Sequence, residues 1–393
     1  MSQASLGSRE HFPDLEAAVY LNHAAISPLS LPVRDAIRRT TDRIAAKGMA
    51  HYHETLDLRA ALRERVGRFL GVGASSVAFT SNTSQGITAV AMGLPWRRGD
   101  RVLIFEGEFP ANVTPWLEAA RLFELEPVWL SAHSAMEDEG RFLDQVEDEL
   151  RRGVRLLAVS AVQFQTGYAM PIRALGALCK RHGAELFVDG IQAVGVMPFD
   201  CTDLGVDYLA VGCHKWLMSL EGSGILTIAP ERLAAFEPRL ASWLSHQDGL
   251  RFLFEGAGHL RYDRPFIEEA LVLEGGMQSM VHNAALDAAL DALESLGLDA
   301  INAHVNRWND ALEPHLNRLG LQSVRSSRLD SRSGSLSCRI PDHVAITDLV
   351  QALDSAGVAV SSPDGHLRFA PHWPNHLDEV PRVVEALESA LEG

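Results

Sequence analysis

The chain has 393 residues, of which 47% are hydrophobic and 22% charged, and its formal net charge is −16. This length allows two domains, or one large domain with an appendage. The acidic balance argues against a nucleic-acid partner, which usually meets a basic protein face. No apolar run approaches the roughly 20 residues of a membrane span, and the first 16 residues contain no apolar leader segment. We therefore expect a cytoplasmic protein without a nucleic-acid or membrane partner.

Metal-ligand residue types occur without the spacing of a metal site. The four cysteines, at positions 179, 201, 213 and 338, lack CxxC spacing, so neither a zinc site nor a disulfide framework is indicated. The segment 51–54 (HYHE) precedes a predicted helix at 55–70 and has no partner at metal-site spacing. The sequence predicts no bound metal.

Helical periodicity holds at 32–47 and again at 55–70. Short apolar runs then alternate with amphipathic segments as far as residue 228, at 77–79, 102–105, 127–130, 156–159, 186–188, 208–211 and 224–228. The spacing leaves room for a helix between most pairs, which is typical of a mostly parallel sheet covered by helices.

The pattern changes near residue 265. Helices are predicted at 279–296, 299–319, 346–356 and 377–391, with strands at 335–340, 358–360 and 367–370. We expect an α/β protein with a mostly parallel seven-stranded sheet in a large domain and a smaller α+β C-terminal domain. The predicted divisions are an N-terminal segment at 1–30, the large domain at 31–265 and the small domain at 266–393.

Polar and aromatic residues follow the first two apolar runs. Thr83 and Ser84 lie in a hydroxyl-rich turn that opens a helix, where free N–H groups suit a phosphate. The alternative is ordinary N-capping by either residue. Phe109 follows the second run, where it would stack on a flat cofactor ring or would simply be a core residue.

An acid and an amine follow two later runs. Asp189 ends the run at 186–188, and Lys215 lies between His214 and Trp216 after the run at 208–211. Since the carboxyl ends of strands face the ligand crevice of an open α/β sheet, we expect a buried cofactor site there. A partly desolvated lysine forms Schiff bases readily. The alternatives are a helix-capping aspartate and an ordinary surface lysine.

A single arginine, Arg368, lies within a short apolar strand near the C-terminus. Its planar guanidinium fits a carboxylate bidentately, which suits the recognition of a substrate. A structural ion pair with an acidic neighbour is the alternative in a chain as acidic as this one.

Together these motifs resemble the aminotransferase class V group of fold-type I enzymes that use pyridoxal 5'-phosphate (PLP). The group includes cysteine desulfurases, selenocysteine lyases, kynureninases and isopenicillin N epimerase-like proteins, and the resemblance covers about residues 20–391. It implies that Lys215 is the catalytic residue and forms a Schiff base with PLP, while Asp189 pairs with the pyridinium nitrogen. The other implied cofactor contacts are Thr83, Ser84 and His214 at the phosphate, Gln192 at the 3-hydroxyl oxygen, and Phe109 and Gln163 at the ring.

The resemblance also implies an α-amino acid substrate and a homodimer with the active site near the subunit interface. Arg368 matches the arginine that binds the substrate α-carboxylate. The segment that borders the substrate is represented by Asn22, His23 and Ala25. His372 and Asn375 fit the rest of the pattern around the arginine strand.

Three departures from the family pattern bear on the reaction. Desulfurases carry a nucleophilic cysteine on a loop before the arginine, whereas residues 361–365 (SSPDG) contain none and Cys338 lies in a predicted strand. Gly212 replaces a serine that often helps to hold the phosphate. The phosphate contact usually donated by the partner subunit is replaced within residues 275–278, where Gln278 or backbone N–H groups would serve.

Without the cysteine loop, the expected reaction is transamination or C–S lysis by β-elimination. Amino-acid epimerisation, kynureninase-like hydrolysis and a non-catalytic PLP-binding role stay open as alternatives. The substrate side chain is not revealed, and Trp243, His246 and Arg251 are candidates for lining its pocket.

Overall fold

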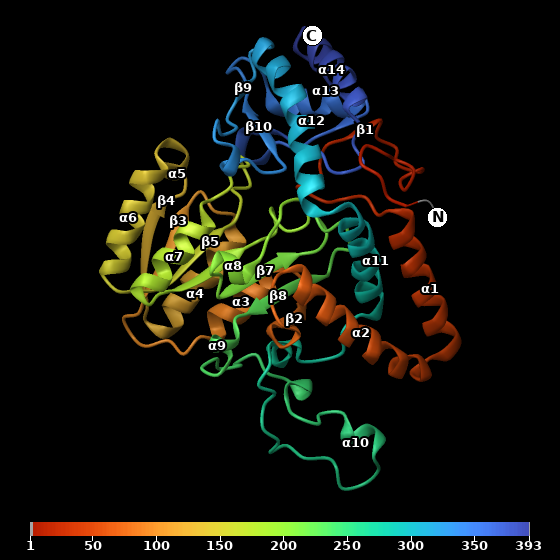
Figure 1. Cartoon of the computed structure of the whole chain (residues 1–393), viewed down its shortest axis with the longest axis vertical. Coiled ribbons are helices and arrows are strands. Elements are labelled where there is room, and N and C mark those ends of the chain that lie inside the picture. The colour runs from red at the N-terminus through yellow and green to blue at the C-terminus, as the bar shows by residue number, and fades with distance from the viewer. Residues whose placement is uncertain (1–2, 393) are drawn as a thin grey trace.

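A seven-stranded sheet forms the centre of the computed structural model, which describes residues 3–392 (Figure 1). The strand order is β2-β8-β7-β6-β5-β3-β4. The pairs among β3 to β7 are parallel, and β8 runs antiparallel to both β2 and β7. This confirms the predicted mostly parallel sheet. The strands are β2 Val77–Thr80, β3 Arg101–Glu106, β4 Glu126–Ser131, β5 Val154–Ser160, β6 Glu185–Asp189, β7 Tyr208–Gly212 and β8 Gly224–Ile228.

Both faces of the central strands are buried, whereas the edge strand β4 is partly exposed along its length. In β3, Leu103 belongs to one apolar cluster and Ile104 to another, because successive side chains of a strand point to opposite faces. Strands buried on both faces read as continuous apolar runs, which explains why the sequence pattern located them. The connecting helices are α3 Thr83–Gly93, α4 Thr114–Phe123, α5 Ser134–Glu137, α6 Glu139–Arg151, α7 Ile172–His182, α8 Cys201–Leu204 and α9 Pro230–Leu233.

Two long helices, α1 (Leu31–Lys47) and α2 (Met49–Phe69), flank the sheet and pack with α11 (Met280–Leu296). The predicted start of the second helix at residue 55 is wrong, because α2 begins directly after Gly48. The φ of 51° at Gly48 favours glycine and ends α1 within a single residue. Segment 51–54 therefore lies inside α2 rather than before it, and no group of metal ligands occurs within residues 3–392.

The C-terminal part holds a separate apolar core above the sheet (Figure 1). The strand β1 (Val19–Tyr20) pairs in parallel with β11 (Val358–Ala359), so the start of the chain is built into this core. The predicted domain boundary between residues 265 and 266 stays a prediction. The remaining elements are α12 Leu298–Arg318, α13 Ile346–Ser355, α14 Val380–Glu392, and a three-stranded antiparallel sheet of β9 Gln322–Ser323, β10 Leu336–Arg339 and β12 His366–Phe369.

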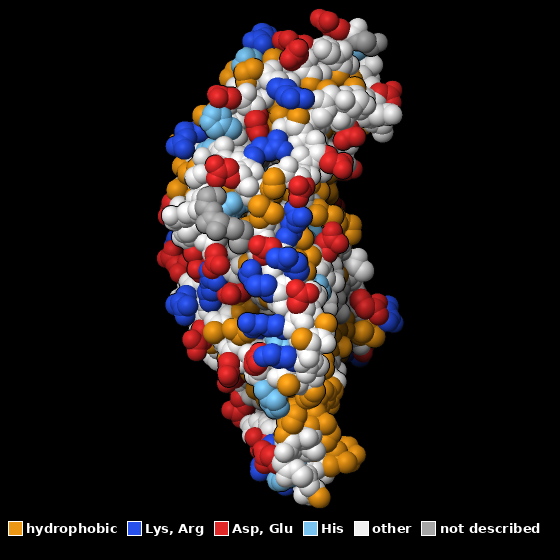
Figure 2. Space-filling view, turned by 90° about the vertical axis from the view of Figure 1, so that its right-hand side faces the viewer, with side chains coloured by type: hydrophobic (Ala, Val, Ile, Leu, Met, Phe, Trp, Pro, Cys, Tyr) orange, Lys and Arg blue, Asp and Glu red, His pale blue; other side chains and the backbone are white. Residues whose placement is uncertain are grey.

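A segment containing α10 (Arg251–Phe254) projects from the end of the molecule opposite the C-terminal part (Figure 1). Figure 2 shows hydrophobic side chains gathered at that end, below a band of Lys and Arg side chains. No helix in the described part of the chain is both long and apolar enough to cross a membrane. The exposed large apolar residues of this segment include Leu240, Trp243, Phe252, Leu253, Phe254, Leu260, Tyr262 and Phe266.

Candidate active site

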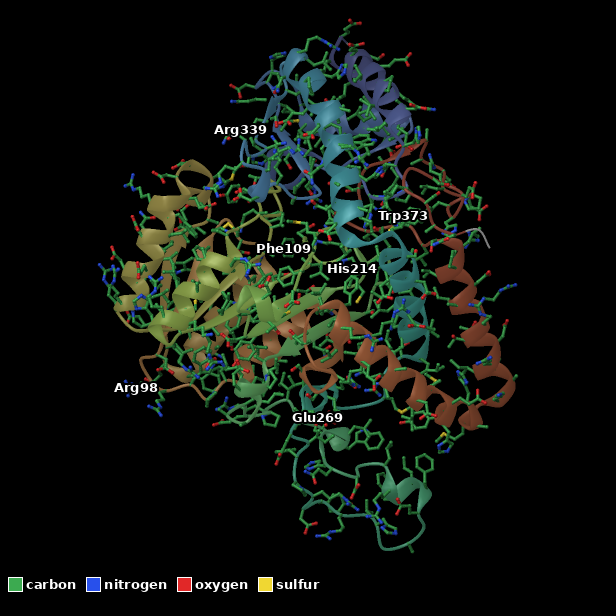
Figure 3. All side chains as sticks on the ribbon, viewed as in Figure 1. Arg98, Phe109, His214, Glu269, Arg339 and Trp373 are labelled. Carbon is green, nitrogen blue, oxygen red and sulfur yellow. The ribbon has the colours of Figure 1, made fainter. Side chains whose placement is uncertain are left out.

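The carboxyl ends of the central strands meet the start of α3 below the C-terminal part, where Figure 3 labels Phe109 and His214. The cap of α3 is Asn82, whose Oδ1 accepts a hydrogen bond from the backbone N–H of Gln85 at 2.8 Å. The alternative prediction that Thr83 or Ser84 caps this helix is therefore wrong. Ser84 is exposed, whereas Thr83 is buried and its Oγ1 has no hydrogen-bond partner within residues 3–392.

The glycine at position 212 leaves room for the Thr83 hydroxyl. A Cβ at Gly212 would lie 2.8 Å from Thr83 Oγ1 and 2.9 Å from Ile191 Cδ1, closer than carbon atoms normally approach. A serine in this position would require Thr83 or Ile191 to move, which gives a steric reason for the departure from the family pattern. His214 follows this strand and is half-buried, and burial together with the charge of Lys215 lowers its pKa.

Asp189 and Lys215 form an acid and amine pair with perturbed protonation. Asp189 is 2% exposed, and its Oδ1 accepts a hydrogen bond from the N–H of Ile191 at 3.0 Å. Burial raises the pKa of Asp189, and the negative charge of Glu108 raises it further. Burial and then the charge of Arg368 lower the pKa of Lys215, against the opposing effect of Asp189. The site thus increases the fraction of neutral, nucleophilic amine above that of an ordinary lysine.

Two aromatic rings stand beside this amine. The Nζ of Lys215 lies 5.8 Å from the ring centroid of Phe109, and Phe109 meets Phe164 edge-on at a centroid distance of 5.3 Å. Phe109 is 47% exposed, so the alternative that it is a core residue is wrong. An exposed ring beside a buried amine is suited to covering a flat ligand.

Arg368 is a buried cation that contacts neutral groups. It is 4% exposed, and it donates hydrogen bonds to the carbonyl of Phe164 at 2.8 Å and to Ser361 Oγ at 3.1 Å. Its Nε has no partner, and no carboxylate pairs with it within residues 3–392. Burial lowers the pKa of its guanidinium to about 10. The structural ion pair that was the alternative is absent, and an anionic ligand would supply the missing charge.

Both predicted glutamines are held by protein groups. Gln192 donates to the carbonyl of Ala24 at 3.0 Å and accepts from Trp216 Nε1 at 2.8 Å. Gln163 donates to Glu108 Oε1 at 3.1 Å. These bonds fix the two amides beside Asp189 and Phe109, and their contacts with a cofactor stay predictions.

The N-terminal residues lie against the end of the arginine strand. The backbone of Asn22 forms an isolated parallel β-bridge with that of Ala370. The side-chain Oδ1 of Asn22 is buried and has no hydrogen-bond partner in the described part of the chain. His23 Nδ1 lies 2.7 Å from Ser27 Oγ, and its ring contacts that of His372 edge-on at 5.3 Å. Burial, and then the charge of His372, hold the pKa of His23 well below its ordinary value. The contacts of Asn22, His23 and Ala25 with a substrate stay predictions.

Some predicted residues lie elsewhere. Arg251 opens α10, at the far end of the molecule from Phe109 and His214 (Figures 1 and 3). Trp243 packs on Phe252, and His246 stacks on Phe266, within the same projecting segment. The expectation that they line the substrate pocket is wrong for their own chain, because these contacts place them in the projecting segment, at the end of the molecule opposite Phe109 and His214.

The predicted replacement of the partner's phosphate contact within residues 275–278 stays a prediction. Gln278 donates to the carbonyl of Glu274 at 2.9 Å. Cys338 is fully buried in β10, as the sequence predicted. The sequence pattern assigns no role to Glu108, Phe164 or Ser361, which the fold brings to the site. The only sequence signal that pointed to Glu108 is its position next to Phe109.

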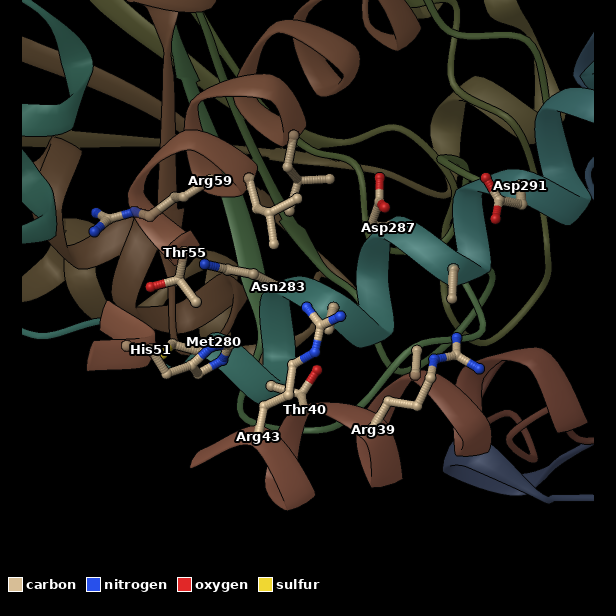
Figure 4. Close-up of a pocket in the computed structure, with 15 residues that line it drawn as sticks. Arg39, Thr40, Arg43, His51, Thr55, Arg59, Met280, Asn283, Asp287 and Asp291 are labelled. Carbon is tan, nitrogen blue, oxygen red and sulfur yellow. The ribbon is translucent and has the colours of Figure 1, made fainter. Parts of the chain in front are cut away.

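A separate cavity of about 250 Å³ lies between α1, α2 and α11 (Figure 4). Arg39 and Arg43 line it from α1, and Asp287 and Asp291 line it from α11. Both acids are paired with Arg65, at 2.7 and 2.8 Å. None of the residues predicted to hold cofactor or substrate lines this cavity.

Similarity to known proteins extends over nearly the whole chain. The pattern of the aminotransferase class-V family matches residues 19–373. The "Uncharacterized aminotransferase YcbU" of Bacillus subtilis is 26% identical and covers 96% of both chains. A "Probable cysteine desulfurase" of Pyrococcus abyssi is 25% identical over 98% of this chain and 96% of its own.

Solved structures show the same fold. The apo cysteine desulfurase of Thermococcus onnurineus aligns with a TM-score of 0.86 at 23% identity and covers 100% of both chains. The cystine C-S lyase C-DES, in a complex with cysteine persulfide, aligns with a TM-score of 0.87 at 22% identity, over 96% of this chain and 98% of its own. These likenesses confirm the fold-type I architecture. The chain belongs to the class V aminotransferase family of PLP-dependent enzymes.

Proposed function

We propose that the protein acts on an α-amino acid through PLP, by transamination or by β-elimination at a C–S bond, and without a cysteine persulfide. The observation that carries the proposal is the buried guanidinium of Arg368, whose charge lowers the pKa of Lys215 and which has only neutral hydrogen-bond partners within residues 3–392. A buried cation without an acid is costly unless an anion joins it. The α-carboxylate of an amino acid is such an anion and places the reacting carbon near the amine.

The residues fit PLP. The buried hydroxyl of Thr83 lacks a partner in the described structure, and it lies at the positive end of α3, which suits the phosphate. Asp189 is a buried carboxylate suited to a protonated ring nitrogen, and Phe109 presents an exposed ring. We infer that Thr83, Ser84 and His214 hold the phosphate. Gln163 and Gln192 would position the ring through the bonds that already fix their amides.

Each residue has a distinct part in the reaction. When bound, PLP supplies an aldehyde that condenses with amines and a ring that withdraws electrons from the substrate Cα. Lys215 Nζ, whose lowered pKa increases the fraction of neutral amine, accepts the proton from Cα. Arg368 binds the α-carboxylate and orients the Cα–H bond toward that amine. Asp189 keeps the ring nitrogen protonated, and Phe109 excludes water from one side.

The cysteines argue against a persulfide relay. All four are buried, and burial raises the pKa of each thiol to about 12. A persulfide relay needs an accessible thiolate. The loop at 361–365 next to Arg368 contains no cysteine. This supports a reaction other than desulfuration, although several relatives carry the name cysteine desulfurase.

A screen of amino acids against the purified enzyme, with and without an α-keto acid acceptor, separates the two reactions. Pyruvate and ammonia formed without an acceptor indicate β-elimination, whereas a new amino acid formed only with an acceptor indicates transamination. The D-enantiomer alone would indicate epimerisation. Lys215→Ala should abolish every turnover and the visible band of the lysine-bound cofactor, and persistence of either would contradict the assigned role.

We also propose that the enzyme is a cytoplasmic homodimer. The projecting segment exposes Trp243, Phe252, Leu253 and Phe254, which are costly to leave in water. A second copy is the occupant that the resemblance implies. Light scattering coupled to gel filtration should give twice the chain mass, and charged substitutions at Phe252 and Leu253 should shift the mass to one chain.

A further inference from the structure

Glu108 is a buried carboxylate two residues after the end of β3, and the proposed reaction leaves it unused. It is 8% exposed. Its Oε1 accepts hydrogen bonds from the backbone N–H of Ser160 at 2.7 Å and from Gln163 Nε2 at 3.1 Å. Its Oε2 accepts from the hydroxyl of Ser160 and from Asn112 Nδ2 at 3.3 Å. Four donors therefore converge on one side chain.

These bonds connect the turn after β3 to the end of β5, which lies next to the end of β6. Ser160 is the last residue of β5 and is the register partner of Asp189 at the end of β6. The next residue, Ala161, donates its N–H to the carbonyl of Asp189 at 2.8 Å. Asn112 in turn accepts from Trp116 Nε1 at 3.1 Å, which ties the turn to α4. Through Glu108, the turn carrying Phe109 is fixed to the strand beside Asp189.

The pattern of donors favours the ionised form of Glu108. Two amide N–H donors, one backbone and one from Gln163, bond Oε1, and a hydroxyl and a second side-chain amide bond Oε2, so both oxygens act as acceptors. Burial opposes this and is the largest influence, so the pKa of Glu108 is raised overall, although each of the four bonds lowers it. Asp189 therefore faces a negative charge from Glu108, the cation of Lys215, and the N–H of Ile191.

We propose that Glu108 is a positioning residue. It holds Phe109 and Gln163 against β5. Its negative charge also acts on Asp189, where it stabilises a proton shared between Asp189 and the cofactor ring. Within this proposal, only the statement that the ring is that of PLP rests on the proposed function. A fixed negative charge favours the protonated form of any neighbouring group, so its removal should make both Asp189 and the bound cofactor lose protons at lower pH.

The holoenzyme of Glu108→Gln, which keeps the size of the side chain and removes its charge, tests this. The pH midpoint of the visible band of the lysine-bound cofactor should fall by at least roughly 0.5, a factor of about three in the ionisation constant. Glu106→Gln is the matched control, because Glu106 ends the same strand but is exposed. Glu108→Asp restores the charge and should recover part of the shift. An unshifted midpoint in Glu108→Gln would overturn the proposal.

A second measurement does not depend on the reaction. In the full-length chain freed of PLP, the ¹³C-carboxyl titration of Asp189, assigned with Asp189→Asn, should move to lower pH in Glu108→Gln. Failure of the proposed function would leave this shift intact, whereas an unchanged titration would refute the role of Glu108. If Glu108→Gln does not fold, Ser160→Ala removes one donor and weakens the ionised carboxylate. The Asp189 midpoint should then fall by a smaller amount, and no change there would equally refute the role.

Discussion

Replacing Arg368 by glutamine should separate binding from stability. A structural arginine stabilises the folded state, whereas a buried guanidinium whose anionic partner is a ligand lowers the stability of the protein while that ligand is absent. Arg368 contacts only a carbonyl and a hydroxyl, and its Nε has no partner within residues 3–392. We expect Arg368→Gln to lose affinity for amino acids without losing stability.

The magnitude follows from the burial of the guanidinium. Burial moves the pKa of Arg368 from an ordinary value of about 12.5 to about 10, which corresponds to roughly 3 kcal/mol of unfavourable free energy. Because the folded-state pKa lies below the unfolded-state value, this cost is complete at every pH below about 10 and disappears as the pH rises through the unfolded value. Loss of two hydrogen bonds, at about 1 kcal/mol each, offsets part of the gain. The unfolding free energy of the variant should rise by about 1 kcal/mol.

The affinity of Arg368→Gln for its amino-acid substrate should fall, although its stability rises. Removing one partner of a buried, charge-assisted pair costs about 2–5 kcal/mol, so half-saturation by an amino acid should rise by roughly 30- to 5,000-fold. Titration of the holoenzyme, followed by the visible band, measures this. An amine of the same side chain without the carboxylate should bind the variant and the wild-type protein equally. Arg339→Gln, at an exposed position of neighbouring β10, is the matched control.

Two results would refute this reasoning. The first is a fall in unfolding free energy of about 2 kcal/mol or more in Arg368→Gln, which is the cost typical of breaking a native network. The second is an unchanged amino-acid titration. Either result would make Arg368 a structural residue of β12 and would remove the main support for an α-amino acid substrate.

The remaining predictions concern the lysine and a buried acid. Since burial and Arg368 lower the pKa of Lys215, PLP loading by cofactor-free protein should reach half its maximal rate below the pH at which ordinary lysines titrate, and Arg368→Gln should raise that midpoint. A midpoint at the ordinary lysine value, measured by stopped-flow absorbance, would contradict this. Glu274 is buried and accepts from Arg63 Nη1 at 2.6 Å and from the N–H of Phe79 at 2.9 Å. Glu274→Ala should therefore cost about 3–5 kcal/mol in urea unfolding, and a cost below about 1 kcal/mol would show that the pair adds nothing.

Local signals located most elements but not their ends. The central strands were recognisable because strands buried on both faces are apolar throughout. The start of α3 was not, because Asn82, Thr83 and Ser84 are consecutive polar residues and each is able to cap a helix. The start of α2 was missed because Gly48 separates two helices without a loop, so no run of turn residues marks the boundary.

The sequence by itself determined that an acid and an amine end two neighbouring strands, since Asp189 and Lys215 each follow a short apolar run and such ends share one edge of a parallel sheet. Only the tertiary structure decided the environment of that pair. The partners of Arg368, the pairing of β1 with β11 and the bonds of Glu108 join residues far apart in the chain. Such contacts depend on how separate elements pack against one another, so no local sequence pattern predicts them.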